Sequence, residues 1–125
     1  MILDTNAFSA IADGDLDIKP IVQRAPVLAL PVVVIGEYRF GIAQSARQSA
    51  NQRWLTESLP KYLILDVTEE TSAHYAELRL ELKRIGKPIP ANDLWIAALC
   101  RQHSLPLLSR DRHFDNVPGL HRIGW

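Results

Sequence analysis

The sequence has little cysteine, no excess of either charge and no long apolar run. One cysteine, Cys100, stands among 125 residues, which excludes an internal disulfide framework and suits a reducing compartment. Lys plus Arg equals Asp plus Glu, at 14 each, so any nucleic acid has to be held by local groups. No apolar stretch approaches the roughly 18 residues of a membrane span, and the chain does not open on a basic segment followed by an apolar one, so we expect no signal sequence. We therefore expect a soluble cytoplasmic protein without a membrane partner.

Hydrophobic residues make up 47% of the chain, which suits a single domain over residues 1–125. Short apolar runs alternate with amphipathic stretches, and this pattern predicts an α/β domain with a mainly parallel central sheet flanked by helices. The predicted strands are Ile2–Asp4, Val27–Leu30, Tyr62–Asp66, Leu105–Ser109 and Leu120–Ile123. The predicted helices are Asn6–Asp13, Ile18–Arg24, Pro31–Gln44, Ala46–Leu59, Thr68–Ile85 and Ala91–Gln102.

Two of the predicted strands run directly into a carboxylate. Asp4 follows the apolar start of the chain, and no neighbouring Lys or Arg neutralises it. The stretch LPLLSRD repeats this arrangement and places Asp111 just after another strand. Because sites in open parallel sheets form beyond the carboxyl ends of the strands, both acids are candidate site residues. The simpler alternatives are that Asp4 caps the following helix and that Asp111 belongs to a turn.

Two further acids lie on the apolar faces of predicted helices. In PVVVIGEYRFGIAQ, Glu37 has apolar residues three and four positions before it, and Phe40 three positions after it. Pairing with Arg39 would be a structural explanation, but the helix turns Arg39 to another face. In IPANDLWIAALC, Asp93 shares its face with apolar residues three, four and seven positions on. A first-turn helix acid remains the alternative for Asp93.

Four carboxylates that meet at one site require a cation. Their desolvation costs several kcal/mol per ion, whereas a helix end returns roughly 0.3 to 1 kcal/mol. A hard divalent ion with oxygen ligands, Mg²⁺ or Mn²⁺, fits such a site. The four histidines show no ligand spacing, and we expect them to be structural or surface residues, with His113 the strongest exception because of its neighbours.

At these residues the sequence resembles the PIN-domain ribonucleases, and specifically the VapC-type toxins of type II toxin-antitoxin pairs. The matching stretches are MILDTNAFSA, VVVIGEYRFGI, IPANDLWIAALC and LLSRDRHFDNVPGL, which occur in the expected order over essentially the whole chain. The resemblance implies a PIN-like three-layer sandwich. It also implies a Mg²⁺- or Mn²⁺-dependent endoribonuclease, in which a metal-activated water attacks an RNA phosphodiester.

The resemblance assigns roles residue by residue. The family's acids fall on Asp4, Glu37, Asp93 and Asp111, with Asp4 and Asp93 as the most direct metal ligands. The other two would complete the set of acids around the metal, partly through metal-bound waters, and one of them would accept the proton of the attacking water. Supporting positions are Thr5, Asn6 and Ser109. Asp115 is either a further member or, as we expect, a turn acid. Arg110 and Arg112 either hold flanking phosphates or are solvated loop residues.

The resemblance also implies partners: a second copy of the chain, and a VapB-type antitoxin that commonly brings a basic side chain against the acids. Other readings differ by single features. An aspartyl-phosphate phosphatase needs a second acid where Asn6 stands, and a receiver domain needs an early acidic pair that is missing. A PIN nuclease that processes RNA or structured DNA outside a toxin pair remains open. A PIN-like module that binds without cutting would usually have lost an acid, and none of the four is missing.

Overall fold

The computed structural model describes residues 1–125 and contains one five-stranded sheet, in which every neighbouring pair of strands is parallel. The strand order is β3-β2-β1-β4-β5. The strands are β1 (Ile2–Leu3), β2 (Ala29–Pro31), β3 (Leu63–Leu65), β4 (Leu107–Leu108) and β5 (Arg122–Ile123). The helices are α1 (Thr5–Ala12), α2 (Lys19–Arg24), α3 (Val32–Ala43), α4 (Gln48–Ser58), α5 (Glu69–Arg84) and α6 (Ala91–His103), with two 3₁₀ helices, η1 (Leu59–Lys61) and η2 (Arg112–Asn116).

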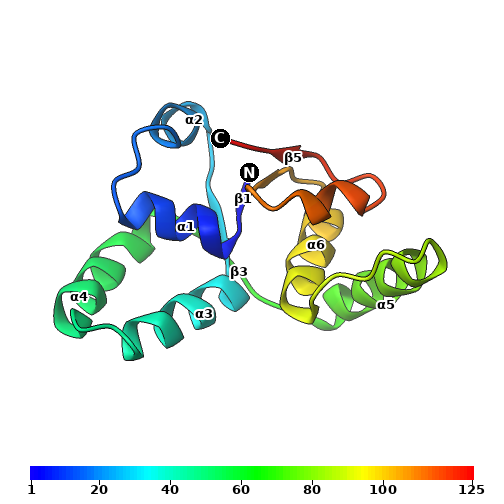
Figure 1. Cartoon of the computed structure of the whole chain (residues 1–125), viewed down its shortest axis with the longest axis horizontal. Coiled ribbons are helices and arrows are strands. Elements are labelled where there is room, and N and C mark those ends of the chain that lie inside the picture. Colours follow the sequence, from blue (N-terminus) through cyan, green and yellow to red (C-terminus); the bar gives the residue numbers. More distant parts are fainter.

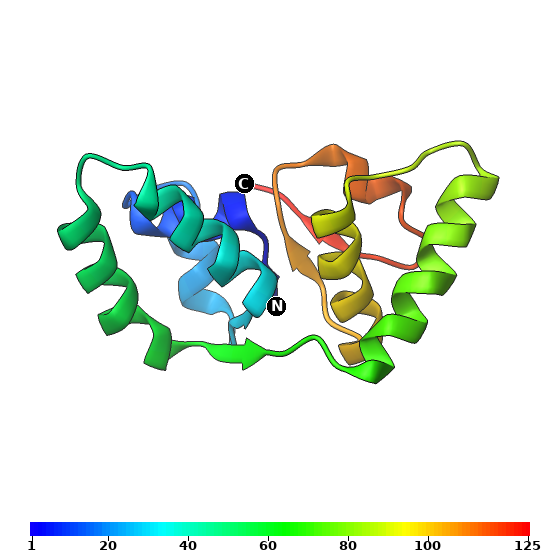
Figure 2. The same cartoon turned by 90° about the horizontal axis from the view of Figure 1, so that it is seen from below.

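Helices flank the sheet in two groups. Figure 1 and Figure 2 show α1 to α4 gathered on one side of the molecule, and α5 with α6 on the other. Helices α3 and α6 face each other across the middle in Figure 2 and are in contact. The predicted α/β class with a parallel sheet flanked by helices is therefore confirmed. None of the helices combines the length and the apolar composition needed to span a membrane.

The core explains why the strands are continuous apolar runs. All four residues of β1 and β4 are fully buried, as is typical of parallel strands covered on both faces. Phe8 of α1 and Phe114 of η2 are the largest fully buried side chains, and they lie among 23 buried hydrophobic residues. Cys100 is one of these, as expected, and burial raises the pKa of its thiol to about 12.

The elements match their predictions, with shorter strands. β1 ends one residue early because the Asp4 carbonyl already accepts the first hydrogen bond of α1, from Phe8 N at 3.0 Å. Helix α4 begins at Gln48 and not at Ala46, because Ser45 Oγ accepts from Arg47 N at 3.0 Å and closes a turn there. These differences are local and leave the topology unchanged.

Candidate active site

Neighbouring strands β1 and β4 deliver two acids to the same edge of the sheet. Ile2 pairs with Leu107 and Leu3 with Leu108. The chain therefore reaches Asp4 at the end of β1 at the level where β4 ends, and Asp111 follows on the loop beyond β4. Since both strands end at this edge, the strand-end prediction places its two carboxylates correctly.

Asp4 is almost completely buried, with 3% of the residue exposed. Its Oδ1 accepts a hydrogen bond from Ala7 N at 2.8 Å and so caps α1. Burial is the main cause that raises the pKa of Asp4, the Ser109 hydroxyl and Ala7 N–H act against it, and the charges of Asp93 and Asp111 raise it further. Capping was the alternative interpretation of this residue, and the structure shows that Asp4 caps the helix while also lying among the other acids.

Glu37 is held in place from two sides. Its Oε2 accepts from Thr5 Oγ1 at 2.9 Å, and its Oε1 accepts from the Asn92 side-chain amide. These two donors belong to the starts of α1 and α6, so Glu37 of α3 is tied to the elements that carry Asp4 and Asp93. It has no contact with Arg39, in agreement with the predicted helix geometry.

His113 stands between two of the acids. Its Nε2 lies 3.0 Å from Asp93 Oδ2, and its Nδ1 lies 2.9 Å from Asp111 Oδ1. Potential ligand atoms of these three residues lie within 4.8 Å of one another. Burial is the main cause that raises the pKa of Asp93; His113 opposes the shift, whereas Asp111 and Glu37 add to it. The imidazole is therefore part of the cluster, and His113 is the exception that its neighbours in sequence suggested.

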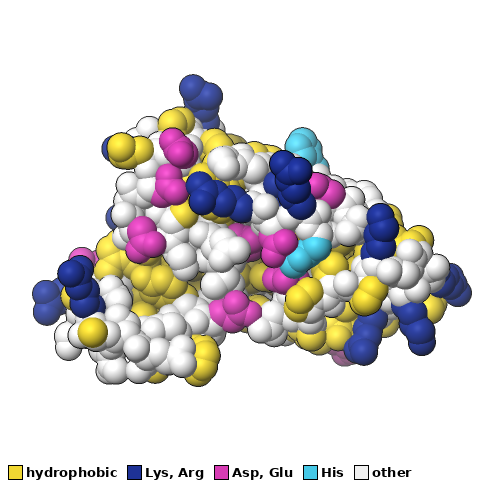
Figure 3. Space-filling view, viewed as in Figure 1, with side chains coloured by type: hydrophobic (Ala, Val, Ile, Leu, Met, Phe, Trp, Pro, Cys, Tyr) yellow, Lys and Arg dark blue, Asp and Glu magenta, His cyan; other side chains and the backbone are white.

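The four predicted acids thus gather at one place. Asp4 is within the electrostatic influence of Asp93 and Asp111, and Asp93 within that of Glu37. Figure 3 shows acidic side chains and a histidine gathered near the centre of this face. The four acids come from the β1–α1 junction, α3, α6 and the β4–η2 loop, which lie far apart in sequence. The donor set consists of carboxylates with one imidazole, which suits a divalent cation.

Comparison with known proteins identifies the family of the chain that carries this cluster. The PIN domain profile matches residues 1–120. The chain belongs to the PIN-domain family. Ribonuclease VapC5 of Mycobacterium tuberculosis is a relative that is 34% identical over 121 residues, which cover 94% of this chain and 87% of that protein.

Two solved structures show the same fold as this PIN-family chain. One is VapBC2 from Rickettsia felis bound to a DNA fragment from their promoter, with a TM-score of 0.90, 26% identity, and coverage of 99% of this chain and 97% of the matched chain. The other is FitAcB from Neisseria gonorrhoeae, with a TM-score of 0.84, 28% identity, and coverage of 98% and 95%.

Of the three predicted supporting residues, two make hydrogen bonds to the acids or their loop and one does not. Thr5 donates to Glu37, as described. Ser109 is fully buried, and its Oγ accepts from Asp111 N at 3.0 Å, so it fixes the turn that leads to Asp111. Asn6 is exposed and its side chain makes no hydrogen bond, so no contact joins it to the acids.

The remaining predicted residues contact other partners. Asp115 accepts two hydrogen bonds from Arg122, which hold its pKa below the usual range. Arg110 lies 3.4 Å from Asp15 and has its guanidinium 4.6 Å from the ring centre of Trp125. Arg112 is exposed and has no ion pair. Of the two arginines suggested for phosphates, only Arg112 is therefore unengaged.

Sequence reasoning missed Asn92 and gave His113 too little weight. Asn92 directly precedes Asp93, and nothing in its neighbourhood announces that its amide reaches Glu37, 55 positions away. His113 follows Asp111 by two residues, and this spacing becomes a contact only because the 3₁₀ helix η2 folds the ring back. For His113, the acid two positions earlier was the available signal.

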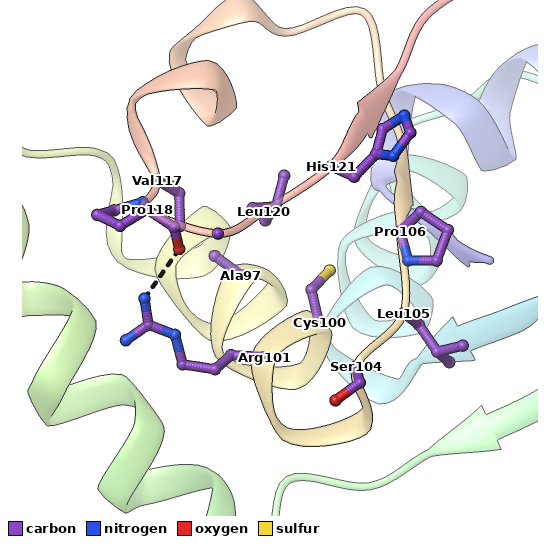
Figure 4. A pocket seen from close by; sticks show the side chains of 11 residues that line it. Ala97, Cys100, Arg101, Ser104, Leu105, Pro106, Val117, Pro118, Leu120 and His121 are labelled. Atoms are coloured by element: carbon purple, nitrogen blue, oxygen red, sulfur yellow. Dashed lines mark hydrogen bonds between the residues drawn. The ribbon is translucent and has the colours of Figure 1, made fainter.

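A separate pocket of about 690 Å³ lies away from the acids. It is lined by the last turns of α6 and the approaches to β4 and β5, whereas the acids lie beyond the opposite ends of these strands. Figure 4 shows Cys100 and Arg101 on its wall, with Arg101 bonded to the carbonyl of Pro118. It offers no carboxylate, so it plays no part in the acidic site.

Proposed function

We propose that this protein is the toxin of a VapBC-type pair and cleaves RNA with a divalent ion held by its acidic cluster. The observation that carries the proposal is the convergence of Asp4, Glu37, Asp93 and Asp111 in a chain of the PIN family. The relatives named ribonuclease support the reaction class. In this proposal the 125 residues act as one domain.

Asp4 and Asp93 are the residues to which we assign the metal. Burial raises the pKa of both carboxyls, so their ionised forms are costly in the folded protein unless a cation compensates. Mg²⁺, with Mn²⁺ as a substitute, suits these oxygen donors. Held by Asp4 and Asp93, such an ion would lower the pKa of a water, orient the scissile phosphate and offset charge that develops during in-line attack.

The other two acids receive different tasks. Both oxygens of Glu37 already accept hydrogen bonds, from Thr5 and Asn92, so this carboxylate is suited to orienting waters at the ion. Asp111 has one oxygen beside His113, while its Oδ2 has no partner. We assign to Asp111 Oδ2 the proton of the attacking water, and to His113 the positioning of Asp93 and Asp111 through its contacts with both.

The proposal includes two protein partners. We expect a homodimer and a VapB-type antitoxin whose basic side chain enters the acidic cluster and competes with the metal. Solved relatives include VapBC complexes. Because RNA is the substrate in this proposal, we place the protein in the cytoplasm.

Cleavage of RNA by the purified protein tests the proposal. Wild-type protein should cut RNA with Mg²⁺ or Mn²⁺ and lose activity in EDTA. Asp4→Asn and Asp93→Asn should each abolish cleavage while the far-UV circular dichroism spectrum stays unchanged. Asp66→Asn is the matched control, because Asp66 is an exposed acid beyond the end of another strand, β3. Undiminished cleavage by both Asp4→Asn and Asp93→Asn would refute the assignment.

A further inference from the structure

Arg122 donates three hydrogen bonds to the segment from Ser109 to Asp115. Its Nε and Nη2 donate to the two oxygens of Asp115, at 2.8 and 3.0 Å, in a bidentate pair. Its Nη1 donates to the backbone carbonyl of Ser109, also at 3.0 Å. One guanidinium on β5 therefore binds residues that lie six positions apart on another part of the chain.

These two acceptors enclose the segment that carries half of the acidic cluster. Ser109 begins the segment directly after β4, and Asp115 lies in η2. Between them stand Asp111 and His113, and the His113 ring contacts both Asp111 and Asp93. No other arginine donates hydrogen bonds to both ends of this segment. Its geometry is therefore fixed at two points by the same rigid planar group.

The guanidinium itself is held firmly. A Cβ at Gly124 would lie 3.1 Å from Arg122 Nη1, so the guanidinium lies close to the backbone of Gly124, two residues further along the chain. The side chain of Arg122 is 17% exposed. Hydrogen bonding to Asp115 raises the pKa of Arg122, and the same contact lowers that of Asp115. Arg122 has little surface left with which to bind a phosphate.

We propose that Arg122 is a positioning residue: by joining Ser109 to Asp115 it sets the place of Asp111 and His113 beside Asp93. The contribution to cleavage rests on the proposed function, whereas the contribution to the segment's order does not. A purely structural role would stabilise the fold without affecting the turnover of folded molecules. A phosphate-binding role would change KM and leave the segment's order unaffected.

Arg122→Gln is the central variant, and Arg101→Gln is its control. Arg101 likewise donates to a backbone carbonyl, that of Pro118 at 2.9 Å, and pairs with a carboxylate, Glu81 at 2.9 Å. It lies on the pocket of Figure 4 and not at the acids. Arg122→Lys keeps the charge but lacks the fork, so it should restore activity only in part.

The first measurement is amide hydrogen exchange of the metal-free protein, followed by mass spectrometry of peptides that cover residues 109–116. Arg122→Gln should speed exchange in this segment by about ten-fold, while peptides of α6 stay unchanged. Arg101→Gln should leave the segment as in the wild type. Unchanged exchange over residues 109–116 in Arg122→Gln would overturn the proposal.

The second measurement is steady-state RNA cleavage at a temperature where all variants are folded. Arg122→Gln should lose about 10- to 100-fold in kcat, because small displacements of catalytic groups have effects of this size, with KM nearly unchanged. Arg101→Gln should keep the wild-type kcat. A loss confined to KM, or an equal loss in Arg101→Gln, would contradict positioning. A wild-type protein that cleaves no RNA would refute the proposed function, and the exchange result would still decide whether Arg122 orders the segment.

Discussion

At the scale of single residues, Asp4 serves two purposes that conflict in the absence of a cation. Its Oδ1 caps α1 through Ala7 N, which stabilises the fold. The same carboxylate is buried beside Asp93 and Asp111, and these surroundings raise its pKa. Ionised Asp4 therefore destabilises the folded state relative to the unfolded chain, where the same carboxylate is solvated. An uncharged residue of the same shape can still accept the hydrogen bond from Ala7 N without that destabilisation.

Asp4→Asn should therefore raise the unfolding midpoint of the metal-free protein at pH 7.5. Because the folded pKa of Asp4 is raised above 3.8, the penalty is present at high pH, shrinks as pH falls through the folded pKa, and vanishes below the unfolded one. The stability difference between variant and wild type should shrink in the same direction. Thermal denaturation in EDTA from pH 7.5 to pH 4 measures it. A variant less stable than wild type at pH 7.5 would contradict this account.

His113 gives a second prediction at this scale. His113→Gln removes the group that lies between Asp93 and Asp111. Since these side chains are partly exposed, we expect the free energy of unfolding in EDTA to fall by no more than about 1 kcal/mol. A bound divalent ion should stabilise the two carboxylates in place of the imidazole. The difference in unfolding free energy between His113→Gln and wild type should therefore narrow in millimolar Mn²⁺.

Urea denaturation with and without Mn²⁺ measures the effect of His113→Gln. His103→Gln is the control, because His103 is exposed at the end of α6 and has no ion pair. A loss of stability in His113→Gln that is the same in EDTA and in Mn²⁺ would show that the imidazole does not share the site with the ion.

At the scale of elements, the ends of the helices and strands determine the site. Asp4 is at the junction of β1 and α1, Asp93 is in the first turn of α6, and Asp111 follows β4. These positions were predictable because apolar runs, capping residues and the parallel pattern are local signals. Glu37 was predictable from its apolar helix face. The sequence therefore indicated that these four acids would lie close together.

The contacts between elements were not predictable in the same way. Asn92 reaches Glu37 only because α3 and α6 meet. Arg122 reaches Asp115 because β5 lies beside β4 in register, with Leu107 opposite Arg122. These contacts depend on the mutual placement of segments that are distant in sequence or separated by a turn, and residue spacing does not encode it.

Helix α5 provides a prediction for the stability of an element away from the acids. Thr71 is fully buried; its Oγ1 accepts from Thr68 N at 3.0 Å and donates to Gln102 Oε1 at 2.5 Å. The first bond belongs to the capping box of α5, and the second ties α5 to α6. Thr71→Val keeps the shape but leaves these partners unsatisfied, so it should cost about 1–3 kcal/mol.

Urea denaturation of Thr71→Val measures the loss in unfolding free energy. RNA cleavage below its unfolding midpoint tests whether the two bonds affect activity. Folded molecules should keep the wild-type kcat, because neither bond touches the acids. Thr56→Val is the matched control: Thr56 is exposed on α4 and donates to the carbonyl one turn earlier. Equal stability losses in the two variants would contradict the role given to the buried hydroxyl.

At the scale of the whole molecule, the acids lie where the two groups of helices meet. Glu37 comes from the group of α1 to α4 and Asp93 from the pair α5 and α6, which lie on opposite sides in Figure 2. Asp4 and Asp111 follow the ends of β1 and β4. A cation bound here would join the two groups of helices and stabilise the native state by mass action. The balanced charge of the chain leaves this cluster as a local feature and not part of a general acidic surface.

The most direct test of this account is anomalous X-ray scattering at the manganese edge from crystals of the protein soaked in Mn²⁺. The account predicts anomalous density bounded by the carboxylates of Asp4 and Asp93, with Glu37 and Asp111 around it, and its loss in Asp4→Asn crystals. Manganese that binds only elsewhere, in a protein whose RNA cleavage depends on the ion, would contradict the central claim that these acids form one metal site.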